Sequence, residues 1–169
     1  LASAEAAGDR DLLIMGHRSA CTTYFWLGDF NRSREHGHRV LALYSEEKHR
    51  HLADVTNIDP RTVVEIYLSI GTWILGYPDR AFQMHEAMEV HARRRDHPFD
   101  IGYALTFGGQ VLDFRCEPEA LLARVEESDR LGRAHSLPFI SEVLAEILRG
   151  IAHMRAGRLA ESIPQLRGA

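Results

Sequence analysis

The sequence predicts an all-α protein, a stack of about four helix-turn-helix repeats of about 40 residues each. Apolar runs that end at a corner residue and restart in a polar turn recur along the chain. Prolines that suit the first turn of a helix recur at the same period. The segments between these signals hold helix-compatible residues over a length typical of helices.

The clearest corner is the stretch WILGYPDRAF at residues 73–82. Its apolar run ends at Gly76 and Pro78 follows, which are the signals of a helix C-terminus and of a new helix N-terminus. Similar corners are WLGDFNRSRE, RCEPEALLAR and RAGRLAESIP. The spacings between successive corner residues are 48, 40 and 41 for the series Gly28, Gly76, Cys116 and Gly157. Internal periods of this size indicate stacked repeats.

The elements follow in order from these signals. Residues 1–7 are interpreted as the end of an earlier helix, closed by Gly8. Pro98 and Pro138 each begin a repeat and stand 40 residues apart, and Pro60 leads its own repeat in the same way. The extra residues of the longest spacing fall in 46–59, EEKHRHLADVTNID, which is expected to be a polar loop. The expected helices are 10–27, 30–46, 60–75, 78–95, 98–115, 118–135, 138–156 and one from 159.

A packing position accompanies each corner. The residue seven positions earlier is always small, in the series Cys21, Ser69, Gly109 and Gly150. Small side chains let two helices approach closely, and a glycine inside a helix costs about 1 kcal/mol that a close contact can offset. We therefore expect Gly109 and Gly150 to face the second helix of their own repeats.

A small residue, a glycine seven positions later and then Ala81 resemble the tetratricopeptide repeat, although that repeat is shorter. YLSIGTWILGYPDRA, HPFDIGYAL and ILRGIAHMRAGRLAESIPQLR are similar to the C-terminal helical repeat region of large bacterial signalling proteins. Those proteins carry an ATPase module, often behind a class III adenylate or guanylate cyclase domain. The resemblance implies a right-handed superhelical stack, a single tetratricopeptide-like domain over residues 1–169.

Such stacks expose a concave surface that the first helices of the repeats line, and they act as binding or regulatory modules. Arg, Trp and Tyr are the usual anchors of interfaces. The expected partner is a peptide, another protein domain of the same chain, or a small effector. By repeat position the expected binding residues are Arg18, Thr22, Phe25, Ile66, Ile70, Trp73, Tyr103, Thr106, Gln110 and Asp113.

Composition excludes several classes of function. The net charge of −4 provides no basic field for a nucleic acid. The longest uncharged apolar stretch, Ile66 to Tyr77, is too short to span a bilayer. Two cysteines form no disulfide framework, which favours the cytoplasm. The chain begins at Leu1 and ends in PQLRGA within a helical pattern, so we interpret it as a fragment of a longer protein.

The sequence holds no catalytic, metal or cofactor motif that we would assign. Neither G-x-x-x-x-G-K-[ST] nor G-x-G-x-x-G occurs. The stretch HEAMEVH at 85–91 begins like a zincin motif but has Glu89 where the second histidine is needed. His17 and Cys21 lie one helical turn apart, at helix-packing positions. The charged stretch 46–51 is expected to be solvated surface, or else a partner contact.

The competing hypothesis is a helical-bundle enzyme or metal-binding protein. Glu65 and Glu146 stand where the repeat pattern usually has a large apolar residue, and a buried acid must find a partner. His153 lies seven residues after Glu146, and Glu142 lies one helical turn before Glu146. The candidate residues for catalysis or metal binding are therefore Glu142, Glu146 and His153. An ion pair between helices is the simpler interpretation of these acids.

The last helix bears on association. Ile163 and Leu166 are apolar positions there that further repeats would cover. Exposed apolar patches drive association. We therefore expect self-association of this chain through its two ends.

Overall fold

The computed structural model describes residues 2–168, and within that range every element is a helix and no strand is present. The all-α prediction is therefore confirmed. No helix in the described range is both long and apolar enough to cross a membrane. The chain divides into two compact units, which we call unit 1 (up to Met84) and unit 2 (from His85). The division falls inside one helix.

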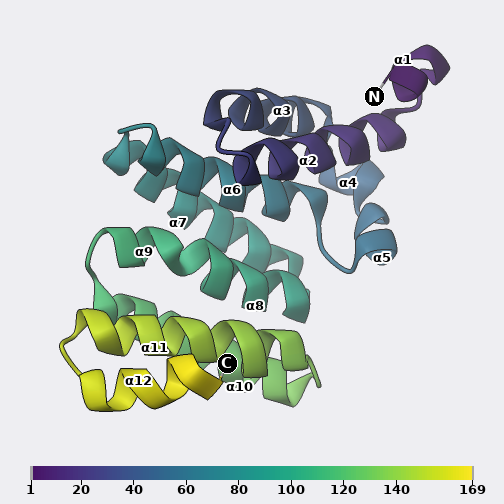
Figure 1. The fold of residues 1–169 in the computed structure, drawn as a ribbon. Coiled ribbons are helices and arrows are strands. Elements are labelled where there is room, and N and C mark those ends of the chain that lie inside the picture. Colours follow the sequence, from purple (N-terminus) through teal and green to yellow (C-terminus); the bar gives the residue numbers. More distant parts are fainter. Residues whose placement is uncertain (1, 169) are drawn as a thin grey trace. The chain divides into compact units, whose positions relative to one another are not determined.

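Unit 1 is a helical hairpin with a further helix packed against both of its arms. Helices α2 and α3 lie side by side, and α6 contacts each of them (Figure 1). Leu68 of α6 fills the space beside Gly37 of α3, where an added Cβ atom would lie 2.8 Å from Leu68 Cδ2. The elements are α1 (Ala2–Ala7), α2 (Arg10–Trp26), α3 (Phe30–Leu43), α4 (Glu46–His49), α5 (Leu52–Thr56), α6 (Pro60–Ile74) and the first part of α7 (Pro78–Arg95).

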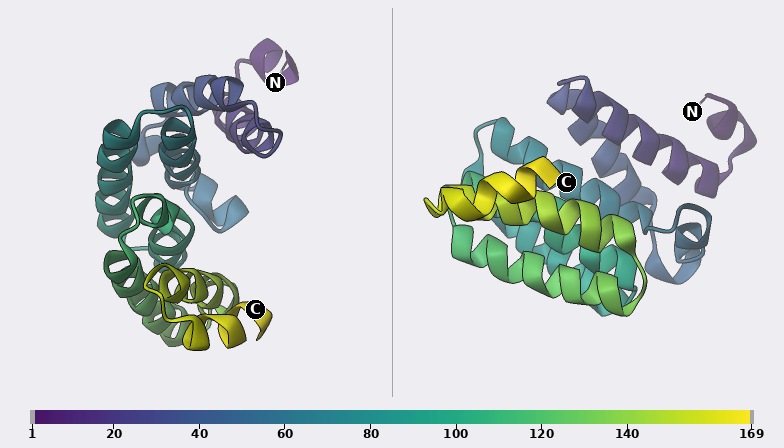
Figure 2. Two further views of the ribbon diagram at one scale, coloured as in Figure 1. Left: turned by 60° about the vertical axis from the view of Figure 1, so that its left-hand side comes forward. Right: turned by 60° about the horizontal axis from the view of Figure 1, so that its bottom comes forward.

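Unit 2 repeats this helical packing. Helix α10 contacts α8 and α11, and α12 lies along α11 (Figure 2). Leu121, Val125 and Ile140 are fully buried in its core. After the remainder of α7 its elements are α8 (Pro98–Thr106), η1 (Phe107–Gly109), α9 (Gln110–Phe114), α10 (Pro118–Ala134), η2 (Phe139–Leu144), α11 (Ala145–Arg155) and α12 (Leu159–Gly168).

All four expected corners end a helix in the left-handed conformation. The φ angles are 78°, 92°, 57° and 75° at Gly28, Gly76, Cys116 and Gly157. At Gly76 the two reverse hydrogen bonds of a Schellman motif close the helix: its N–H donates to Trp73 O at 2.9 Å, and Tyr77 N–H donates to Thr72 O at 3.1 Å. The same pair of bonds is present at the other three corners. The prediction that the helices break at these residues is confirmed.

A second series of left-handed residues, which the sequence analysis missed, lies in the links that precede α6, α8 and η2. Asp96 and Ser136 both have φ of 54°, and each stands two residues before the proline that opens the next helix. Asn57 has φ of 57° before α6. None of these residues is glycine, so the sequence did not indicate their left-handed conformation. Only the prolines that follow them indicated that a new helix begins there.

Two expected helices are not regular along their length. The helix expected over 98–115 is interrupted at Phe107–Gly109 by a 3₁₀ turn. Thr106 Oγ1 donates a hydrogen bond to Gly102 O at 2.7 Å, and two glycines follow, which together favour a local departure from α geometry. The helix expected over 138–156 begins with π-helical residues Phe139–Leu144.

The expected polar loop over 46–59 is wrong. This segment forms α4 and α5, and it buries Leu52, Ala53 and Ile58 as well as His49. The segment is fixed by a buried carboxylate at its end: Asp59 accepts a hydrogen bond from Tyr44 Oη at 2.6 Å and caps α6 through Thr62 N–H at 2.9 Å. The insertion is therefore a folded part of unit 1, because Leu52, Ala53 and Ile58 pack inward while most of its charged residues are exposed.

The small residues before the corners lie at helix contacts, as expected for both glycines. A Cβ atom on Gly109 would lie 3.1 Å from Leu121 Cδ1 of α10, and one on Gly150 would lie 2.7 Å from Leu166 Cδ2 of α12. Cys21 is buried against Ser33 of α3, with Sγ 3.6 Å from Oγ. Ser69 is also buried.

We predict that Gly109→Leu lowers the free energy of unfolding by about 1–3 kcal/mol or more. Leu121 is fully buried and cannot move aside, whereas Leu166 is 40 % exposed and can. Gly150→Leu should therefore cost less than Gly109→Leu. Urea unfolding of both variants measures the difference, with Ala123→Leu on the exposed side of α10 as the control. Equal stability of Gly109→Leu and the control would contradict this contact.

Candidate functional site

The structure buries four of the ten residues expected to line a binding face. The exposed fractions of Phe25, Ile66, Ile70 and Thr106 are 9 %, 0 %, 1 % and 0 %. A buried side chain offers no surface to a partner, so the expectation that these four line an open face does not hold. The other six are partly exposed: Arg18, Thr22 and Trp73 in unit 1, and Tyr103, Gln110 and Asp113 in unit 2. Their role in binding stays a prediction.

Gln110 and Asp113 lie at an apolar pocket in unit 2. The pocket has a volume of about 320 Å³ and lies between α9, with the turn before it, and α11, with the π-helical segment before it. Most of its walls are aliphatic or aromatic, and the polar groups are confined to the two residues that the sequence analysis named. The lining residues are Phe107, Gln110, Asp113, Phe114, Leu144, Ile147, Leu148 and Ile151.

Aromatic rings extend from this pocket along α8. Tyr103 and Phe107 are stacked with ring centroids 5.4 Å apart, and Phe99 and Tyr103 are stacked at 6.1 Å. Phe139 continues the row, stacked on Phe99 at 6.4 Å, and is 46 % exposed. Because residues four apart share a face of a helix, the rings form one stripe that ends in the pocket through Phe107. We call the pocket and this stripe the aromatic face.

Asp113, one of the residues that line the pocket, belongs to a charged pair. Arg155 of α11 donates to Asp113 of α9 through Nε at 2.6 Å and through Nη2 at 3.3 Å. The hydrogen bond and the charge of Asp113 raise the pKa of Arg155 above its ordinary value. Paired guanidinium and carboxylate groups hold a fixed relative orientation, so this pair fixes α9 against α11.

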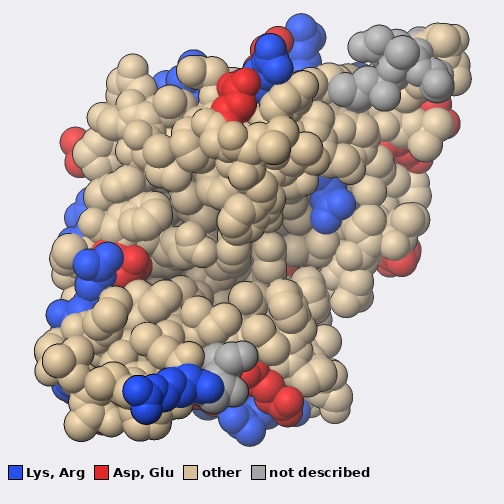
Figure 3. All heavy atoms as spheres, in the orientation of Figure 1, with Lys and Arg blue, Asp and Glu red and all other residues tan. Residues whose placement is uncertain are grey.

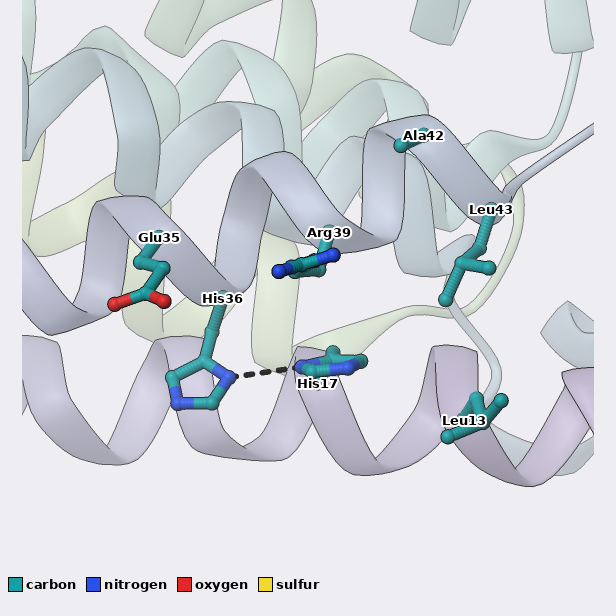
Figure 4. A pocket seen from close by; sticks show the side chains of 7 residues that line it. All are labelled: Leu13, His17, Glu35, His36, Arg39, Ala42 and Leu43. Atoms are coloured by element: carbon teal, nitrogen blue, oxygen red, sulfur yellow. Dashed lines mark hydrogen bonds between the residues drawn. The ribbon is translucent and has the colours of Figure 1, made fainter. Parts of the chain in front are cut away.

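A second cavity, of about 460 Å³, lies between α2 and α3 in unit 1 (Figure 4). His17 and His36 meet there across the two helices, with their Nδ1 atoms 2.8 Å apart and their ring centroids 5.1 Å apart. The ring of Tyr24 stacks on the imidazole of His36, with the two ring centroids 5.4 Å apart. The remaining lining residues are Leu13, Glu35, Arg39, Ala42 and Leu43.

The residues of the competing enzyme hypothesis have other partners. Glu146 pairs with Arg149 of its own helix, and His153 Nδ1 lies 3.0 Å from Gln165 Oε1. Glu142 is exposed. Glu65, the other acid of that pattern, pairs with Arg61 at 2.8 Å. Within residues 2–168 no three acidic, histidine or cysteine side chains are grouped so that they could hold a metal ion.

Burial makes Cys21 unreactive. Its pKa is raised to about 11 because it is buried, and the contact with Ser33 opposes this only in part. A thiol with such a pKa carries almost no thiolate at neutral pH. His17 lies against His36 of α3 and Cys21 lies against Ser33 of α3, so both side chains contribute to the packing of α2 against α3.

A network of charges joins α7 to α10 within unit 2. Glu89 lies 3.0 Å from Nε2 of the buried His85 and 3.3 Å from Nε of Arg124. Arg93 donates to Glu127 at 2.8 Å and extends the network toward solvent. Burial alone would raise the pKa of Glu89, but the contact with His85 and the charges of His85 and Arg124 together lower it. The interrupted zincin-like stretch 85–91 is thus part of a structural ion network.

Several residues of the aromatic face were missed by sequence reasoning. Phe99, Phe107 and Ile147 were not among the expected binding residues, nor was Arg155. The spacing of four between Phe99, Tyr103 and Phe107 is a signal that could have found the stripe. Nothing in the sequence indicated that Arg155 would pair with Asp113, because 42 residues separate them.

In the part of the chain that the structure describes, the face of the molecule in Figure 3 carries no dominant sign of charge that would attract a charged partner. On the face that Figure 3 shows, the basic and acidic side chains of the described residues are interspersed, and neither sign forms a continuous field. This agrees with the small net charge. The two cavities are therefore distinguished by the residues that line them and not by a surrounding field of charge.

We predict that Glu89→Gln lowers the free energy of unfolding by about 1–3 kcal/mol at neutral pH, since it leaves Arg124 and His85 without their carboxylate. The folded-state pKa of Glu89 lies below the ordinary value of 4.5. Its contribution is therefore full above pH 4.5 and is lost as the pH falls below that value. Urea unfolding at a series of pH values measures both effects.

Glu86→Gln is the matched control, because Glu86 lies on the same helix and is exposed. It should leave the stability nearly unchanged at every pH. A difference between wild type and Glu89→Gln that persists undiminished at pH 3 would show that the charge of Glu89 is not the cause.

Comparisons with models of protein families and with curated proteins found no match to this chain.

Proposed function

We propose that this chain is a non-catalytic binding module that holds a peptide segment of a partner protein on the aromatic face of unit 2. The observation that carries the proposal is the apolar pocket between α9 and α11, which lies at the end of the stripe of stacked rings on α8. Aromatic residues are enriched where proteins bind one another, because they bury much area at low cost in conformational entropy.

The size of the pocket favours one large side chain. About 320 Å³ lies at the lower end of the range for ligand pockets and accommodates an anchor such as leucine, phenylalanine or tryptophan. The stripe then offers a further surface along α8, so a segment several residues long is the occupant that uses both parts.

Gln110 supplies the polar recognition. Its side chain makes no hydrogen bond with any residue in the described part of the chain, and its amide can both donate and accept. A peptide backbone also presents an N–H donor and a C=O acceptor, so it can form both hydrogen bonds with this amide. Asp113 is already occupied by Arg155, so this pair forms a rigid polar edge beside the anchor pocket.

The repeated corners support a finer description of the fold as a right-handed, tetratricopeptide-like stack. The resemblance of the helical segments supports placement in a larger bacterial signalling protein of the cytoplasm with ATPase or cyclase modules. In that setting the peptide would belong either to another domain of the same protein or to a separate partner.

The proposal is tested by selecting a displayed library of random 12-residue peptides on the chain. Peptides that carry a large apolar anchor should be enriched, and a synthetic copy should shift the backbone amide signals of α9 and α11 in an NMR titration. Ile147→Glu should weaken binding of that peptide by about tenfold or more, since it places a charge in the anchor pocket.

Ala123→Glu provides the control, because Ala123 is an exposed residue of α10 outside the pocket. Binding by this variant should equal that of the wild type. Selected peptides that shift signals elsewhere, or that bind Ile147→Glu as well as wild type, would overturn the proposal.

A further inference from the structure

The cavity between α2 and α3 has two chemically different halves. Leu13, Ala42 and Leu43 form an apolar half, at the end of α3 and opposite it on α2 (Figure 4). His17 and His36 lie in the other half, together with charged side chains of α3. An apolar chamber with a few polar groups at one end is the usual composition of a small-molecule site, and about 460 Å³ is within the usual size range.

Arg39 is the cation of the polar half. It makes no hydrogen bond or ion pair with any residue that the structure describes, although Glu35 stands one helical turn away. Figure 4 shows Arg39 beside the two imidazoles and Glu35 at the far end, away from Leu13 and Leu43. An arginine at a cavity is a donor for a carboxylate in a fixed planar geometry.

The two histidines form one wall of this site. An Nδ1 to Nδ1 contact of 2.8 Å needs one proton between the rings, so one Nδ1 donates and the other accepts. The ring that accepts at Nδ1 carries its own proton on Nε2. Arg39, whose guanidinium is always charged, is therefore the positive charge of this site.

We propose that this cavity binds an organic monocarboxylate with an aliphatic chain. The carboxylate would pair with Arg39 beside the histidines, and the chain would lie against Leu13, Ala42 and Leu43. Glu35 opposes a second negative charge, so a monoanion is favoured over a dianion. This site lies wholly within unit 1 and is independent of the peptide site of unit 2.

The test is an NMR titration of the whole chain with octanoate, with 1-octanol and octanedioate as comparisons. Octanoate should shift the amide signals of α2 and α3 around the cavity and should bind more tightly than either comparison. Arg39→Gln should weaken octanoate binding by about tenfold or more, because it removes a charge-assisted pair. Arg34→Gln, on the exposed side of α3, should bind octanoate like the wild type.

Each alternative result overturns the proposal in a recognisable way. Equal affinity for 1-octanol would show an apolar cavity with no carboxylate recognition. Shifts confined to α9 and α11 would show that octanoate enters the peptide pocket of unit 2 instead. Unchanged affinity in Arg39→Gln, with an intact circular dichroism spectrum, would remove the residue on which the inference depends.

Discussion

The left-handed residue at each of the four corners is the constraint on which the rest of the structure depends. Gly28, Gly76, Cys116 and Gly157 all have positive φ, and each reverses the chain within a few residues by two backbone hydrogen bonds. Because the reversal is tight, the two helices that it joins must lie close together. A close contact then requires a small residue at a fixed distance along the first helix, which explains why Gly109 and Gly150 can be tolerated inside helices.

The helices depart from regular α geometry beside the pocket that we propose as the peptide site. The 3₁₀ turn at Phe107–Gly109 lies where the aromatic stripe of α8 enters the pocket between α9 and α11. The π-helical segment Phe139–Leu144 before α11 also lines this pocket through Leu144, and its Ile140 packs against Gly102 of α8. Departures from α geometry of this kind often accompany functional sites. In unit 1 the helices α2 and α3 are regular, and the cavity between them is lined in part by the histidine pair.

The helical character and the helix ends could be predicted well because their signals are local. A glycine after an apolar run and a proline at a first turn fix helix ends whatever the tertiary context, so the expected helices agree with the observed ones to within a few residues. Residues 46–59 were misjudged because charges such as those of EEKHRH hide the apolar positions Leu52 and Ile58. The candidate sites were harder to predict than the helices. They depend on two pairs that only the packed helices bring together, Arg155 with Asp113 and His17 with His36.

A matched pair of substitutions at equivalent corners tests the central claim most directly. A Cβ atom at Gly76 would meet no atom within 4 Å, so Gly76→Ala changes only the cost of its φ of 92°. Cys116 has the same conformation without being glycine, so Cys116→Gly relieves that cost. Urea unfolding should show that Gly76→Ala lowers the free energy of unfolding by about 1–2 kcal/mol, while Cys116→Gly leaves it unchanged or raises it. An unchanged stability in Gly76→Ala, or a clear loss in Cys116→Gly, would contradict the account.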